Sequence, residues 1–215
     1  MDEMTPRPAP STSAAPARRY VALGDSYTIG TSVERAERFP DQLVAALRSR
    51  GTPLELVANL GVNGYTSADL IREELSALDG LEPAYVSVLI GVNDAVQGVP
   101  LAVYDRNVST ILDDLLRRLP ARAIVTVSTP DYTVTPAGAD FGEPSVRSAA
   151  IRAANDALRS LALERSIAFV DIHDLSLRAA ADRSLVASDG LHPSGAQYAL
   201  WVERLVPVVG DLLVD

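Results

Sequence analysis

The chain has 215 residues, 47% of them hydrophobic and 22% charged, which is the balance of a globular protein that buries one sizeable core. Its formal net charge of −9 and its lack of Lys and Arg clusters argue against nucleic acid as a partner. The absence of cysteine excludes disulfides and thiolate-bound zinc, and no segment reaches the roughly 18 to 20 consecutive apolar residues that a membrane span needs.

The first 17 residues are rich in Pro, Ala, Ser and Thr and contain no apolar run that could serve as a secretory signal. We therefore expect a disordered leader over residues 1–17 and a single domain over residues 18–215. A cytoplasmic location is the default expectation, although processing could have removed a signal peptide. The sequence leaves the oligomeric state open.

Short apolar runs alternate with segments of helical period along the first half of the chain. The run at residues 20–23 is β-branched or aromatic at its centre and stops at Gly24, which predicts a buried strand. In chain order, the pattern then predicts a helix at 39–50, a strand at 54–60, a helix at 67–78 and a strand at 84–90.

The second half repeats the alternation. The pattern predicts, in chain order, a helix at 101–119, a strand at 123–128, a loop at 129–144, a helix at 145–165, a strand at 167–172 and a last helix at 194–213. Pro207 is a potential break in that last helix. An irregular stretch is expected before it.

Five strands that alternate with helices predict right-handed crossovers and a parallel sheet, because near-continuous apolar strands must be covered on both faces. The predicted fold class is α/β, a doubly wound three-layer α/β/α structure. Ligands of such sheets bind beyond the carboxyl ends of the strands. The chemistry is therefore expected in the loops that follow the strands.

Four loops carry small polar residues at this predicted edge. They are GDSYTIG at 24–30, NLGVNG at 59–64, GVND at 91–94 and DGLHP at 189–193. Each one alone could be an ordinary turn, since Gly, Asn and Asp favour turns. Their joint appearance at one edge of one sheet favours a catalytic site instead.

Ser26 is the candidate nucleophile, because a serine hydroxyl becomes reactive when a neighbouring base takes its proton. The chain has two histidines, and His192 stands three residues after Asp189, a spacing that lets the carboxylate accept the Nδ1 hydrogen. His173 has no distinctive companion, so we assign it a structural or surface role. We expect Asp25 and Asp94 to hold their turns rather than to act as an acid–base pair.

Attack on an acyl carbonyl builds negative charge on oxygen, so the site also needs preorganised hydrogen-bond donors. The backbone N–H of Ser26, that of Gly64 and the side-chain amide of Asn93 are candidates. The residues alone leave Gly61 and Asn63 as competitors of Gly64. Tyr65, Tyr132 and the loop at 129–144 are candidates for lining the substrate pocket, which we expect to be open and shallow.

These four loops resemble the sequence blocks of the GDSL family, also called SGNH hydrolases, over residues 20–198. The resemblance implies a flavodoxin-like five-stranded fold and metal-independent hydrolysis of esters or thioesters through an acyl-enzyme. It assigns the nucleophile to Ser26, the acid and base to Asp189 and His192, and the oxyanion hole to Ser26, Gly64 and Asn93. The four blocks occur in the family's order, and no catalytic position departs from the family pattern.

The expected partner is a small-molecule ester, with no cofactor, no metal, no nucleic acid and no stable membrane insertion. An acyltransferase or a lysophospholipase or thioesterase would use the same residues and remains an alternative. A catalytically silent module that binds carbohydrate or lipid is the alternative outside the enzymes. No G-x-S-x-G, G-x-G-x-x-G or Walker motif is present, which disfavours an α/β-hydrolase, a dinucleotide site and a P-loop.

Overall fold

The computed structural model describes residues 17–213. The leader expected over residues 1–17 lies, except for Ala17, outside the described residues. No helix within the described range is long and apolar enough to cross a membrane.

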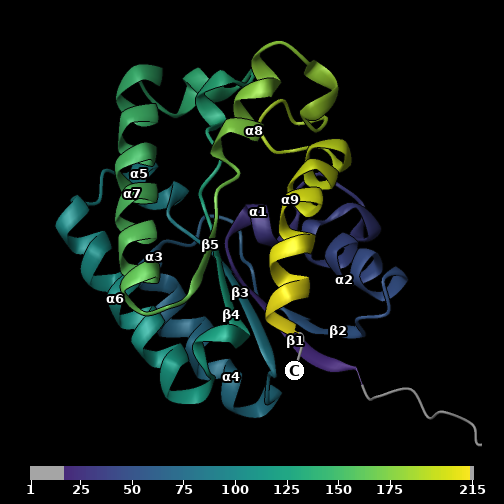
Figure 1. The fold of residues 1–215 in the computed structure, drawn as a ribbon. Coiled ribbons are helices and arrows are strands. Elements are labelled where there is room, and N and C mark those ends of the chain that lie inside the picture. Colours follow the sequence, from purple (N-terminus) through teal and green to yellow (C-terminus); the bar gives the residue numbers. More distant parts are fainter. Residues whose placement is uncertain (1–16, 214–215) are drawn as a thin grey trace, which may run out of the picture.

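The core of the fold is a five-stranded sheet with the order β2-β1-β3-β4-β5, and every neighbouring pair is parallel (Figure 1). Its strands are β1 (Arg18–Gly24), β2 (Leu54–Asn59), β3 (Tyr85–Leu89), β4 (Ile124–Val127) and β5 (Ala168–Val170). All five strands expected from the sequence are confirmed. The chain adds β2 on one side of β1 and β3 on the other, so the topology switches at the carboxyl ends of β1 and β3. Such a switch point is where open α/β sheets bind ligands.

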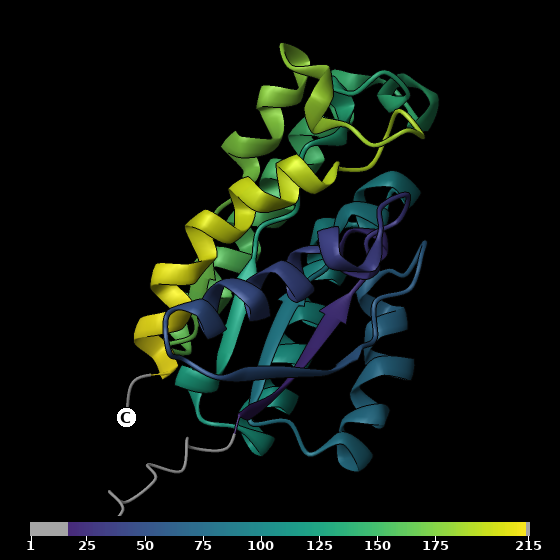
Figure 2. The ribbon, with the colours of Figure 1, turned by 90° about the vertical axis from the view of Figure 1, so that its right-hand side faces the viewer.

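Helices cover both faces of this sheet and give three layers (Figure 2). One face carries α2 (Phe39–Ser49) and α9 (Gly195–Leu213), while the other carries α4 (Leu75–Leu81), α6 (Leu101–Arg118) and α7 (Pro144–Glu164). The central strands are buried on both sides, and every residue of β3 is buried. This confirms the predicted doubly wound α/β class.

The short helices α1 (Ser26–Ile29), α5 (Val92–Gln97) and α8 (His173–Leu177) were not expected from the sequence. The helix expected at 67–78 is present, divided into α3 (Ser67–Asp69), a π-helical turn η2 (Leu70–Glu74) and α4. Single 3₁₀ turns lie at η1 (Arg35–Glu37), η3 (Ala121–Ala123), η4 (Tyr132–Val134), η5 (Gly138–Phe141), η6 (Arg178–Ala180) and η7 (Arg183–Leu185). The expected loop at 129–144 therefore contains two helical turns, and the expected irregular stretch before α9 contains α8.

The break considered at Pro207 does not occur, because α9 continues through it. Pro207 is exposed, whereas Leu205, Val206 and Val209 on the same helix are buried. An internal proline costs a helix about 3 kcal/mol or more. The apolar burial of the flanking turns, at roughly 1.5–3 kcal/mol for each large side chain, outweighs that cost.

An aromatic cluster of Tyr27, Phe39, Tyr198 and Trp201 joins α1, α2 and α9. The Trp201 ring centroid lies 4.9 Å from that of Tyr198 in an edge-on arrangement and 6.4 Å from that of Tyr27. The Tyr198 hydroxyl donates to the carbonyl oxygen of Tyr27 at 2.9 Å. The residue next to Ser26 is therefore tied to the helix that follows His192.

Candidate active site

The loops at the carboxyl ends of the strands surround a cavity of about 220 Å³. Ser26, Gly64, Asn93 and His192 all line it, so the structure brings together one residue from each of the four sequence motifs. Asp189 contacts this set through His192.

Ser26 is the first residue of α1, directly beyond the end of β1. The Asp25 side chain caps this helix, because its Oδ1 accepts a hydrogen bond from the Tyr27 N–H at 2.9 Å. Gly24 permits the sharp turn, since its φ is +149° and a Cβ there would lie 2.1 Å from the carbonyl oxygen of Leu89. Strand, glycine and cap together fix the serine at the cavity, where it is 7% exposed.

The imidazole of His192 is held by Asp189, whose Oδ2 lies 2.6 Å from Nδ1. The same carboxylate accepts backbone N–H bonds from Leu191 and His192 and a hydroxyl bond from Ser32 at 2.7 Å. Partial burial tends to raise the pKa of Asp189, but the hydrogen bonds outweigh it and lower this pKa to about 2. The carboxylate is therefore ionised at neutral pH and keeps the hydrogen of the neutral imidazole on Nδ1.

Nε2 is then the nitrogen left to act as a base toward the cavity. The Tyr27 ring packs beside the imidazole, with centroids 5.4 Å apart. Among the described residues, no hydrogen bond joins Ser26 Oγ to the imidazole. Catalytic hydrogen bonds of unliganded enzymes are often long and shorten only when substrate binds.

Donors for an oxyanion converge on the same cavity. The Ser26 N–H belongs to the first turn of α1, where no carbonyl of the helix can accept it. Gly64 lines the cavity with φ +83°, and one N–H of the Asn93 amide donates to the Tyr65 carbonyl at 2.9 Å, which leaves its second hydrogen free. Gly61 is not such a donor, because its N–H is bonded to Asn59 Oδ1.

The rest of the cavity wall is mainly apolar and also includes Tyr27 and Asn63. Its apolar side chains are those of Val92, Val96, Tyr132, Phe141 and Leu191, with the rings of Tyr132 and Phe141 edge-on at 6.0 Å. Two of these side chains come from the 129–144 loop, which the sequence analysis had named as a lining candidate. Tyr65, the other tyrosine considered, is not part of the lining and meets the site only through its carbonyl.

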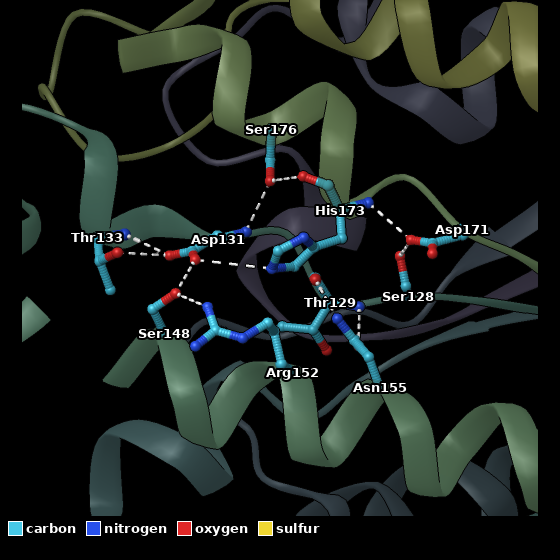
Figure 3. Close-up of polar contacts among 10 residues, drawn as sticks. All are labelled: Ser128, Thr129, Asp131, Thr133, Ser148, Arg152, Asn155, Asp171, His173 and Ser176. Atoms are coloured by element: carbon cyan, nitrogen blue, oxygen red, sulfur yellow. Dashed lines mark hydrogen bonds and ion pairs between the residues drawn. The ribbon is translucent and has the colours of Figure 1, made fainter. Parts of the chain in front are cut away.

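A polar network fixes that loop from behind (Figure 3). Asp131 is 1% exposed, and its carboxylate accepts hydrogen bonds from Thr133 Oγ1 at 2.6 Å and Ser148 Oγ at 2.5 Å. His173 Nε2 lies 3.6 Å from Asp131 Oδ2, and Ser176 accepts the Asp131 N–H. Burial tends to raise the pKa of Asp131, but these contacts hold it well below its usual range. His173 thus contacts Asp131 and not Ser26, which matches its assigned structural role.

Three buried carboxyl groups lie beneath the site. Asp94 accepts bonds from both the N–H and the hydroxyl of Ser67, so it holds the start of α3 rather than its own turn. Burial raises the pKa of Asp25 to about 8 and that of Glu74 to about 9, and the Glu74 carboxyl accepts the Gly24 N–H at 2.8 Å. Both side chains are therefore largely protonated at neutral pH.

The sequence analysis missed Glu74, although it stands four residues from Leu70 and from Leu78 on the same apolar helix face. Within residues 17–213, no group of three or more His, Asp or Glu side chains is placed to hold a metal ion.

A family model described as "GDSL-like Lipase/Acylhydrolase family" matches residues 22–200. No curated protein sequence matches the chain significantly.

Solved structures of similar fold include a lipase/acylhydrolase from Enterococcus faecalis, with 18% identity, a TM-score of 0.71 and coverage of 90% of this chain and 96% of that one. A catalytic mutant of an acetylxylan esterase from Geobacillus stearothermophilus has 18% identity and a TM-score of 0.71, over 92% and 97% of the two chains. The esterase EstA from Pseudoalteromonas sp. has 16% identity and a TM-score of 0.67, over 91% and 98%. At these identities the likeness concerns the fold.

Proposed function

Because the chain belongs to the GDSL-like lipase/acylhydrolase family, we propose that it cleaves carboxylic esters of short to medium acyl chains with Ser26 as nucleophile. The observation that carries the proposal is the 2.6 Å contact between His192 Nδ1 and Asp189, at a cavity that Ser26 also lines. Activation of a serine requires a base that takes its proton and an acid that orients the base, and His192 and Asp189 are placed for these roles.

In the first half of the reaction, His192 Nε2 removes the hydroxyl proton of Ser26 as Oγ attacks the ester carbonyl. The negative charge that develops on the carbonyl oxygen is met by the N–H groups of Ser26 and Gly64 and by the Asn93 amide. Each such donor is worth about 2.7–4 kcal/mol in the transition state. The imidazolium then gives its proton to the departing alcohol, and the acyl group stays on Ser26.

Water completes the cycle by the same steps. His192 takes a proton from the attacking water, the tetrahedral intermediate collapses, and Ser26 Oγ regains a proton as the carboxylic acid leaves. Asp189 stays ionised throughout and stabilises the imidazolium. No cofactor enters these steps.

Two features support short to medium acyl chains. The apolar wall gives an acyl chain a surface to bury, and the cavity volume of about 220 Å³ is below the roughly 300–1,000 Å³ of pockets for drug-sized ligands. One protein of similar fold is an acetylxylan esterase. The small cavity volume and this protein of similar fold both favour a small acyl group over a long one.

The test is hydrolysis of p-nitrophenyl acetate, butyrate, octanoate and palmitate by the wild type, Ser26→Ala and a control, Ser49→Ala. Ser49 is an exposed serine near the end of α2, so its replacement removes the same hydroxyl far from the cavity. We expect Ser26→Ala alone to lose activity and labelling by a fluorophosphonate, with an optimum at acetate to octanoate. Equal activity in all three proteins would refute the serine mechanism, and a palmitate optimum would refute the chain length.

A further inference from the structure

A second groove, with a volume of about 560 Å³, runs beside the catalytic cavity. It is lined by residues 29–33, residues 61–63 and Arg38. Asn63 lines both hollows, and the Thr31 hydroxyl donates to its Oδ1 at 2.5 Å. The groove therefore opens directly next to the cavity that contains Ser26.

The groove lies on the side of the catalytic residues where Asp189 is. Its lining residue Ser32 donates to Asp189 Oδ2, the same oxygen that contacts His192 Nδ1. The following inference rests on the proposed function, in which His192 protonates the departing alcohol. If the acyl chain occupies the apolar cavity, the alcohol has to extend past its rim, and this groove is a hollow that begins there.

Arg38 is the cation of this groove, and no carboxylate of residues 17–213 forms an ion pair with it. Its side chain makes no hydrogen bond or ion pair with any described residue, and its Nε is buried without a partner. Asp41, one turn further along, has Arg35 as its ion-pair partner at 3.3 Å. A guanidinium that is partly desolvated and unpaired is unfavourable unless an anion approaches its remaining N–H groups.

The backbone beneath Arg38 is shaped to hold it. Gly30 has φ +73°, and a Cβ at this position would lie 2.4 Å from Arg38 Cγ. The aliphatic part of the arginine therefore packs onto the glycine that ends α1, four residues after the nucleophile. Gly30 therefore does two things: it adopts the left-handed conformation that ends α1, and it leaves room for the Arg38 side chain to pack against the backbone.

The available polar groups of the groove are mainly donors. The Oδ1 of Asn63 is occupied by Thr31, so its amide hydrogens remain, together with the N–H groups of Arg38. We propose that this groove binds an anionic group, a carboxylate or a phosphate, on the alcohol portion of the ester. Since the chain carries a net charge of −9, long-range electrostatics repel such substrates, and the local cation has to provide the selectivity.

The test compares butyrate esters of 3- and 4-hydroxybenzoate with the matched esters of 3- and 4-hydroxybenzamide, which differ in charge and little in shape. A phosphate arm uses the butyrate esters of 3- and 4-hydroxyphenyl phosphate. The enzymes are the wild type, Arg38→Gln, Arg38→Lys and the control Arg35→Gln. Arg35 is 77% exposed and lies outside the groove, so its replacement removes the same charge one turn away. Each enzyme is described by its ratio of kcat/KM for charged over neutral esters, and the change in this ratio between wild type and variant cancels differences in leaving-group reactivity.

We expect Arg38→Gln to lower this ratio by roughly tenfold, mostly through KM, because a hydrogen bond to a charged group has about that effect on binding. Arg38→Lys keeps part of the preference and guards against misfolding of the glutamine variant, and Arg35→Gln leaves the ratio within about twofold. The phosphate esters are compared with the same benzamide esters, and the anion whose ratio falls more in Arg38→Gln is the one that the groove binds.

An unchanged ratio in Arg38→Gln, with neutral esters still hydrolysed in a Ser26-dependent manner, overturns the anion groove alone. Hydrolysis that does not depend on Ser26 overturns the proposed function instead. The two failures are therefore distinguishable.

Discussion

Replacement of Asp131 by asparagine would remove a buried charge from the support of the cavity wall. The Asp131 carboxylate accepts bonds from the N–H and hydroxyl of Thr133 and from the Ser148 hydroxyl, and it lies 3.6 Å from His173 Nε2. An asparagine can accept the Thr133 bonds through Oδ1, but it turns an NH₂ group toward Ser148 and His173. The substitution therefore keeps the shape and breaks one side of the network.

The expected loss follows from these contacts. A hydrogen bond to a charged group contributes about 1.5–3 kcal/mol, and the pair with His173, which at 3.6 Å is too long for a hydrogen bond, contributes up to about 1 kcal/mol. We therefore expect Asp131→Asn to lower the free energy of unfolding by about 2–4 kcal/mol at pH 7. Because Tyr132 follows directly and lines the cavity, KM should rise as well.

The pH dependence has a definite sign. The folded state holds the pKa of Asp131 well below the unfolded value of about 3.9. Its stabilisation is thus complete above about pH 4 and is lost as the pH falls through the folded pKa. The difference between wild type and variant should be constant from pH 7 to pH 5 and shrink below about pH 4.

Urea denaturation at pH 7, 5, 4 and 3 would measure both the size and the sign. Asp140→Asn is the matched control, because Asp140 is an exposed aspartate on the same loop. A loss below about 0.5 kcal/mol in Asp131→Asn at pH 7, the range of ordinary surface changes, would refute the reasoning.

Two further predictions concern the other carboxyl groups. Glu74→Gln should cost little at pH 5, because the folded carboxyl titrates only at about 9 and the amide oxygen can still accept the Gly24 N–H. The unfolded carboxyl ionises near pH 4.3, so the free energy of unfolding of the wild type falls as the pH rises toward 9. The variant has no such carboxyl, and its stability relative to the wild type should therefore increase over this range. An unchanged difference in urea stability between pH 5 and pH 9 would contradict this. Asp189→Asn should lower kcat by roughly 10³- to 10⁴-fold because the imidazole loses its orienting charge. Ester hydrolysis at pH 7 with near wild-type kcat would remove Asp189 from the proposed triad.

Much of the fold could be predicted from the sequence, because buried parallel strands are short apolar runs that end at glycine or asparagine. The site loops followed from the same logic, since parallel strands bring their carboxyl ends to one edge. Ser26, Asn93 and the segment 61–64 could thus be predicted to lie together, whereas the choice of Gly64 within that segment came from the family resemblance.

The short helices α1, α5 and α8 could not be predicted, because four to six residues are too few to show a helical period. The network of Asp131 and His173 joins loops that only the β4–β5 pairing brings together, so neither residue has a local signal. Arg38 was missed for the same reason, as its significance depends on Gly30 and Asn63 beside it.

The aromatic cluster also makes the chain its own spectroscopic probe. Trp201 is the single tryptophan of the sequence, and its ring is fully buried within 6.4 Å of Tyr27, which in turn lies 5.4 Å from the imidazole of His192. Intrinsic fluorescence excited at the indole therefore comes from the junction of α1, α2 and α9. Its emission during unfolding should report when the helices that carry Ser26 and follow His192 separate, without any attached dye.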